Sequence, residues 1–134
     1  MNRYQKKAWL EEAWNCQRTI EYCDMILNDP SIYSSPGFRE RVQTSKGNEA
    51  EQKVARQMAE ADRAVKDRDR AVSELEKRKA AINALRDGNQ KKVLWLRYIR
   101  HYSWDDVCRS MSYSRTSCHY IHMAALDKLK IEHL

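Results

Sequence analysis

The chain has 134 residues and a formal net charge of +6, and 33% of its residues are charged, but it holds only three glycines and two prolines. This composition is typical of a soluble, helix-rich protein. No run of eighteen apolar residues occurs, and the opening MNRYQKKAWL has no apolar signal core, so neither membrane insertion nor export is indicated. We therefore expect a cytoplasmic protein without a membrane partner.

Four cysteines, Cys16, Cys23, Cys108 and Cys118, could form two disulfides. The chain is nevertheless too long and too charged to resemble a small secreted scaffold held together by disulfides. We interpret all four cysteines as reduced thiols.

The first expected helix covers about residues 2–27, where apolar residues recur at spacings of 4, 3, 4, 3 and 4. This spacing is typical of one seam of a coiled coil or helical hairpin. The seam positions are Trp9, Ala13, Cys16, Ile20, Cys23 and Leu27. Pro30 ends the helix, because proline disfavours helical geometry in the preceding residue, and a polar, mobile loop is expected at about 29–47.

A second, long helix is expected from Asn48, which can form a capping box with Glu51, to Asp87, with Gly88 as its stop. It would be roughly 58 Å long against roughly 39 Å for the first helix, which therefore cannot cover it. The uncovered apolar face predicts a homo-oligomer; the alternative is a charged helix exposed to solvent. The apolar seam comprises Val54, Met58, Ala61, Val65, Val72, Leu75 and Ile82, and Arg68 and Lys79 interrupt it.

Charge divides the chain into two parts. Residues 1–88 hold 17 Lys/Arg against 15 Asp/Glu, whereas residues 89–134 hold 8 against 4 and all four histidines. The helical spacing and this division of charge together predict an all-α protein with two domains. Residues 1–88 form a helical hairpin with a long coiled-coil-like helix, which is the oligomerisation region, and residues 89–134 form a three-helix unit.

The three-helix unit begins with the amphipathic stretch KVLWLRY at 92–98. After a polar break, Ser103 can cap a short helix, and Ser114 can cap a second one. Two short helices joined by a short turn form a helix-turn-helix. The turn contains no glycine, so Ser112 or Tyr113 must supply its backbone conformation.

The last helix carries an outward face suited to DNA. Its residues Arg115, Thr116, His119 and Tyr120 donate hydrogen bonds or stack against nucleic acid, so we predict that they read bases. Lys92, on the preceding helix, is predicted to contact phosphate. The alternative is an ordinary three-helix unit whose outward polar residues face solvent. The face expected to dock the helix comprises Cys118, Ile121, Ala125, Leu126 and Leu129.

The segments KVLWLRY, SWDDV and YSRTSCHYIHMAALDKL resemble region 4 of bacterial primary sigma factors, which bind the promoter −35 element. The layout of the whole chain resembles small phage regulators of the RinA and ArpU type, which control late gene transcription. The resemblance implies a double-stranded DNA partner, the cytoplasm of a bacterial host, and base-reading positions for the four residues of the outward face. It also implies phosphate contacts, at Arg97, Ser103, Trp104 and Ser114.

The outward face departs from the sigma pattern at three positions. Thr116 stands where that pattern has an acidic residue, His119 where it has arginine, and Tyr120 where it has glutamine. The connection between Tyr98 and Ser103 is also shorter. The DNA target is therefore not expected to be the sigma target.

Metal binding and catalysis are not indicated. Cys108, Cys118, His119 and His122 are metal-ligand types, but structural zinc usually shows close-spaced ligand pairs, and neighbouring residues point about 100° apart on a helix. We expect no metal and no cofactor. Because the chain has no glycine-rich phosphate loop, nucleophile elbow or paired carboxylates in a pocket-forming context, we expect no catalytic residues and no enzyme.

Two function classes remain. The first is a sequence-specific transcription regulator that activates phage late genes, either by touching host RNA polymerase from a nearby site or by standing in for sigma region 4. The second is a phage packaging component similar to a small terminase subunit, which combines a helix-turn-helix with an oligomerising stalk. Ring-like stoichiometry would favour packaging, and a defined promoter site would favour regulation.

Overall fold

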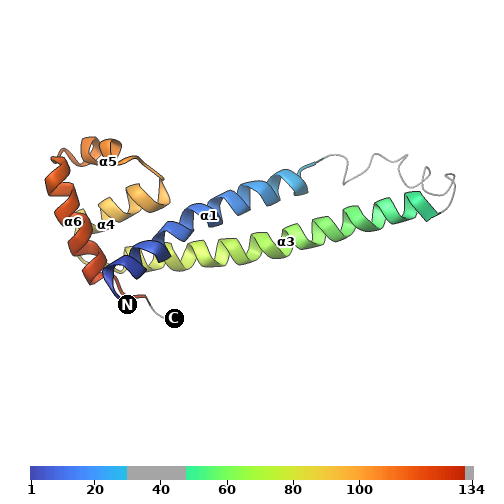
Figure 1. Ribbon diagram of the computed structural model, residues 1–134, viewed down its shortest axis with the longest axis horizontal. Helices are drawn as coiled ribbons and strands as arrows, with labels where there is room; N and C mark the ends of the chain where they lie inside the picture. Colours follow the sequence, from blue (N-terminus) through green and yellow to red (C-terminus); the bar gives the residue numbers. More distant parts are fainter. Residues whose placement is uncertain (30–47, 132–134) are drawn as a thin grey trace. The chain divides into compact units, whose positions relative to one another are not determined.

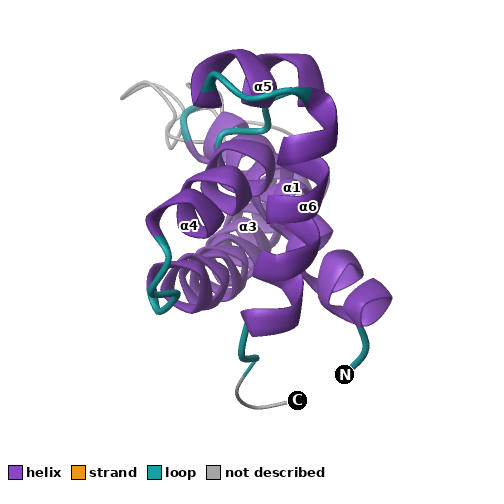
Figure 2. Ribbon diagram, turned by 90° about the vertical axis from the view of Figure 1, so that its left-hand side faces the viewer, coloured by secondary structure: helices purple, strands orange, loops and turns teal. Residues whose placement is uncertain are grey.

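The computed structural model of the chain describes residues 1–29 and 48–131. Within these ranges every regular element is a helix and none is a strand (Figure 2), so the predicted all-α fold is confirmed. No helix among the described residues is long and apolar enough to span a membrane. The loop predicted at about 29–47 lies almost wholly outside the described residues, and the side chain of Asn48, the expected cap, is not described.

The helices follow one another along the chain as labelled in Figure 1. They are α1 (Arg3–Leu27), α3 (Asn48–Asn83), α4 (Gly88–Leu94), the π-helical segment η1 (Trp95–Ile99), α5 (Trp104–Met111) and α6 (Arg115–Lys128). Contacts divide the chain into two units. We call residues 1–17 and 73 onward the terminal unit, and residues 18–72 the middle unit. The division into domains 1–88 and 89–134 stays a prediction.

The long helix ends earlier than predicted. α3 stops at Asn83 rather than at Asp87, and Gly88 is the first residue of α4 rather than a helix stop. The reason is the carboxylate of Asp87, which accepts hydrogen bonds from the backbone N–H groups of Asn89 and Gln90 at 2.9 and 3.1 Å. Asp87 is therefore an N-cap, and its side chain favours the start of a new helix over the continuation of the old one.

The buried face of α3 is partly displaced from the predicted seam. Leu75 and Ile82 are buried as predicted, but Val65 is 45% exposed. The other buried positions are Ala64, Ala71 and Arg78. An arginine can be buried here because its guanidinium donates to the carbonyl oxygen of Trp9 and to Glu74, at 2.8 to 3.0 Å, and a buried charge is tolerated only when it is paired.

Two apolar clusters hold the terminal unit together. The larger joins α1, the end of α3, α4, η1 and α6, and contains Leu10, Ile82, Leu85, Leu94, Tyr98, Ala125, Leu126 and Leu129. The smaller lies beneath the helix-turn-helix and contains Val93, Val107, Met111 and Cys118. Burial of a leucine side chain contributes about 1.5–3 kcal/mol. Both clusters include residues of α6, so they fix that helix at two points along its length.

Candidate nucleic-acid interface

The two short helices, α5 and α6, begin at the serines predicted to cap them. The hydroxyl of Ser103 accepts from the backbone N–H of Asp106, and the hydroxyl of Ser114 accepts from that of Ser117, both at 3.2 Å. Ser112 adopts a left-handed backbone with φ 58°, so it supplies the turn that has no glycine. Ser103 thus sets the start of α5, and Ser112 and Ser114 set the start of α6.

The outward face of α6 matches the expected one. All four residues predicted to read bases are exposed, including Tyr120 at 70%. On the opposite face Cys118, Ala125, Leu126 and Leu129 are buried as predicted. The helix is thus anchored along one side and free along the other, which is the arrangement that a recognition helix needs.

The exposed residues of α6 share a hollow with one residue of α5. The hollow has a volume of about 370 Å³ and is lined by Trp104, Arg115, Thr116, His119 and Tyr120. The structure therefore brings together the four residues predicted to read bases and one of those predicted to contact phosphate. A tryptophan and a tyrosine beside an arginine can offer both an apolar surface and hydrogen-bond donors to a base edge.

One arginine of α5 and one of α6 are only loosely paired with carboxylates. The Nε atom of Arg115 lies 3.9 Å from Asp105 Oδ1, and Arg109 Nη1 lies 3.5 Å from Asp106 Oδ1. All four side chains are more than half exposed, and exposed pairs of this kind contribute about 0–1 kcal/mol. Both guanidinium groups can therefore leave these carboxylates for a stronger anion such as phosphate.

The remaining residues predicted to contact phosphate lie elsewhere. Lys92 is exposed on α4, and Ser103 and Ser114 are exposed helix caps. Arg97 is half-buried, with its guanidinium 5.1 Å from the ring of Trp14 and 5.0 Å from the ring of Trp104. It also donates to the carbonyl oxygen of Tyr102 at 2.8 Å. Arg97 thus holds Trp104, which lines the hollow.

A buried aromatic group behind the hollow was missed by sequence reasoning. The hydroxyl of Tyr98 and Nε2 of His122 are hydrogen-bonded at 2.8 Å, and the ring of Trp104 meets that of His122 edge-on at 4.7 Å. Trp14 of α1 stacks on Tyr98 at 5.7 Å. His122 follows Cys118 by four residues and precedes Ala125 by three, so helical spacing already indicated its inward position.

Burial sets the protonation of this group. It lowers the pKa of His122 to about 4, with smaller effects of the charges on Lys7, His119 and Arg97, and it raises the pKa of Tyr98. Both side chains are therefore neutral near pH 7. A neutral histidine hydrogen-bonded to tyrosine is a structural support for α6 rather than a contact for DNA.

Comparison with known proteins places the chain in a family. A family model described as "Protein of unknown function (DUF1492)" matches residues 32–130. The chain belongs to the DUF1492 family. A search of curated proteins and a search of solved structures return no match. The matched range holds every candidate interface residue of this DUF1492 chain, whereas Trp14 lies outside it.

The thiols of this DUF1492 chain are all free cysteines. Burial, followed by a hydrogen bond with Cys108, raises the pKa of Cys118 to about 11, and burial also raises the pKa of Cys16 and Cys23. Thiols with raised pKa stay protonated at neutral pH and are poor nucleophiles and metal ligands. Among the residues that the structure describes, no three His, Cys, Asp or Glu side chains group so as to hold a metal ion.

Proposed function

We propose that the chain is a sequence-specific DNA-binding transcription regulator, and that it activates late genes of a phage as regulators of the RinA and ArpU type do. The observation that carries this proposal is the shared hollow, in which Trp104 and the four exposed residues of α6 surround one surface. Polar side chains without a role would be expected to scatter over the solvent face. Here they gather at the capped start of a rigidly docked helix.

The proposed mode of binding follows from the geometry of α6. The major groove is about 12 Å wide and admits one helix. With the start of α6 in the groove, Arg115 lies at the first helical position and can contact guanine O6 and N7, while Thr116 and His119 follow along the same face. Tyr120 offers its ring to a thymine methyl or its hydroxyl to a base edge.

Phosphate contacts position the helix in this mode. The backbone N–H groups at the starts of α5 and α6 favour anions, because the positive end of each helix dipole lies there. Lys92 adds a charge from α4, and Trp104 can rest on the sugar-phosphate chain. Such contacts raise affinity for all DNA, and the hollow supplies specificity. Activation then proceeds by contact with host RNA polymerase or by replacement of sigma region 4.

The experiment that tests this proposal is selection of bound sequences from a random double-stranded DNA library with the full-length protein. We expect a short motif to be enriched by the wild type and lost with Arg115→Ala. Arg18→Ala, an exposed arginine of the middle unit, is the matched control and should select the same motif. Failure of the wild type to enrich any sequence would overturn the proposal.

A packaging role similar to that of a small terminase subunit is the second candidate. It is favoured by the exposed apolar residues of the long α3, Met58 at 62% and Val65 at 45%, which suit an oligomerising stalk. Mass measurement with and without the selected DNA separates the two candidates. A closed ring that binds DNA without an enriched motif favours packaging, and a defined motif favours regulation.

A further inference from the structure

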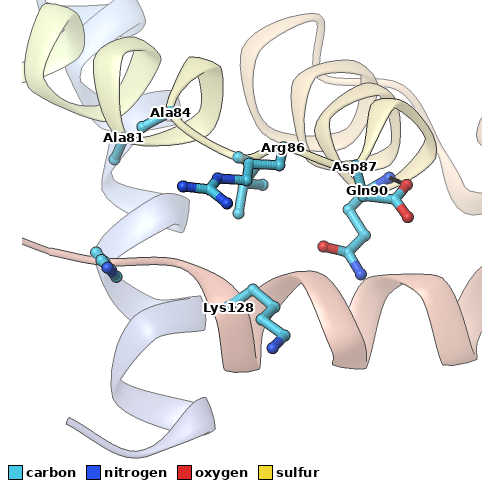
Figure 3. Close-up of a pocket in the computed structure, with 8 residues that line it drawn as sticks. Ala81, Ala84, Arg86, Asp87, Gln90 and Lys128 are labelled. Carbon is cyan, nitrogen blue, oxygen red and sulfur yellow. Dashed lines mark hydrogen bonds between the residues drawn. The ribbon is translucent and has the colours of Figure 1, made fainter.

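A second hollow lies in the terminal unit and shares no lining residue with the first. Figure 3 draws the side chains that line it, and its volume is about 720 Å³. It is lined by Ala81, Ala84, Leu85, Arg86, Asp87, Gln90, Lys128 and Lys130. We call it the basic hollow. Residues of the α3 end, the α3–α4 connection, α4 and the end of α6 surround it, so several elements must fold together to form it.

The rim of the basic hollow carries positive charge without a partner. Arg86, Lys128 and Lys130 are exposed, and none forms an ion pair within the described part of the chain. Among the described residues of the lining, Asp87 carries the one carboxylate, and it is already engaged in capping α4. By contrast Asp127, next in sequence to Lys128, is paired with Arg3 at 2.7 Å. An occupant of the hollow must therefore bring its own negative charge.

Part of the lining is apolar, because it includes Ala81, Ala84 and Leu85. The phosphate groups of nucleic acid gain no hydrogen bond from alanine and leucine side chains. A helix that presents apolar side chains flanked by carboxylates has both features that the hollow requires, and helix-in-groove recognition uses anchors at spacings of three and four. The hollow therefore favours an acidic, amphipathic helix over nucleic acid.

One face of α3 in the middle unit has this pattern. Met58, Asp62, Val65 and Asp69 follow one another at spacings of 4, 3 and 4, which places them on one side of the helix. All four are exposed, and among the described residues neither aspartate forms an ion pair. We call these four residues the acidic stripe. It alternates apolar and acidic side chains, whereas the lining of the basic hollow combines apolar side chains with cations.

We propose that the acidic stripe of one copy docks into the basic hollow of another copy. Within one chain the stripe and Ala81 lie on the same continuous helix, α3, so the stripe cannot enter the hollow of its own chain unless α3 breaks. Two stripes do not pair face to face either, since Asp62 and Asp69 of both copies would meet and like charges repel. Charge complementarity thus selects stripe against hollow.

This contact joins two different surfaces, so it is heterologous. When two copies dock, one keeps a free hollow and the other keeps a free stripe, so further copies can bind at either end. Heterologous contacts close into rings when the rotation between copies permits and otherwise extend into filaments. The contact does not depend on the proposed function, because no residue of the stripe or of the basic hollow lines the hollow formed by Trp104 and the outward face of α6, which we call the DNA hollow.

Reciprocal charge reversal in the full-length protein tests the contact. In one variant the stripe is reversed, with Asp62→Lys plus Asp69→Lys; in the other the hollow is reversed, with Arg86→Glu plus Lys128→Glu. Each variant alone places like charges in the contact, so each should stay monomeric in light scattering at concentrations where the wild type assembles. A 1:1 mixture should assemble again, because each stripe then meets a hollow of opposite charge.

The control for the stripe variant is Glu21→Lys plus Glu60→Lys, which changes net charge equally at exposed positions outside the stripe and should assemble as the wild type does. Circular dichroism checks that every variant is folded. A monomeric wild type, or a mixture that stays monomeric, overturns the inference. So does a hollow variant that assembles normally but loses DNA affinity, which would make the hollow a nucleic-acid surface. Because mass is measured without DNA, the assembly result can be interpreted even if the protein proves not to bind a specific DNA sequence.

Discussion

Replacement of Arg115 and of Lys92 by alanine should impair DNA binding in two different ways. Arg115 is the first residue of α6, its side chain is 73% exposed, and its nearest carboxylate is 3.9 Å away. Because it has so few contacts within the chain, Arg115→Ala should leave the fold intact. Loss of a bidentate contact to guanine costs about 1–3 kcal/mol, or roughly 5- to 150-fold in affinity for the selected motif.

Arg115→Ala should change the affinity for random DNA only slightly. The ratio of the affinity for the motif to the affinity for random DNA should therefore fall toward one. Lys92 is exposed on α4 and does not line the DNA hollow. Lys92→Ala should therefore weaken binding to motif and random DNA alike, and it should reduce the slope of log affinity against log salt by about one.

Fluorescence anisotropy titrations of both DNAs at several salt concentrations provide these numbers. Circular dichroism of each variant is the control, because Arg115 follows the cap Ser114 and could act through helix stability. If Arg115→Ala lowers affinity for motif and random DNA by the same factor, Arg115 is a phosphate contact and the assignment of α6 as the recognition helix is wrong.

Three further predictions concern the Tyr98–His122 pair, the pH dependence of stability, and metal binding. Tyr98→Phe leaves the buried Nε2 of His122 without its partner and should lower the free energy of unfolding by about 1–3 kcal/mol in urea titrations, whereas Tyr120→Phe at an exposed position should not. The pKa of His122 is about 4 in the folded chain and about 6.5 when unfolded, so protons bind the unfolded chain first. The contribution of His122 to stability should be complete above about pH 6.5 and decrease toward pH 4. The free energy of unfolding should therefore be lower at pH 5 than at pH 7, and His122→Gln should make this difference smaller. Chelator treatment should leave the thermal transition and DNA affinity unchanged, and stoichiometric zinc in the purified protein would contradict this.

Local signals predicted the helix-turn-helix well. Ser103 and Ser114 cap α5 and α6 as their residue types indicated, and helical spacing predicted most of the buried and exposed faces of α6, although His122 is buried and Ile121 is only partly buried. The absence of glycine narrowed the turn to two residues, of which Ser112 is the left-handed one. Each of these features depends on residues within a few positions of one another, so sequence reasoning could reach it.

Features that depend on distant residues were not predicted. The backbone carbonyl oxygen of Arg97 accepts a hydrogen bond from Trp14 Nε1 at 3.3 Å, across 83 positions of sequence. No residue close to Arg97 in the sequence predicts this contact. The burial of Arg78 likewise depends on the carbonyl oxygen of Trp9. Seam assignment by apolar spacing therefore predicted only part of the buried face of α3, since it passed over Arg78, which is buried because it pairs with Glu74 of the same helix and with the carbonyl oxygen of Trp9.

The contacts of α1 determine which segments of the chain must be inherited together if recombination is to leave the core intact. Trp14 stacks on Tyr98, Gln17 donates to the carbonyl oxygen of Ile99 at 2.8 Å, and Leu10 is fully buried in the cluster that also holds Leu126. A crossover that joined a foreign N-terminal region at residue 88 would leave these core positions facing side chains that did not evolve with them. The exchangeable module is therefore larger than the helix-turn-helix, and a functional hybrid must inherit α1 along with α6.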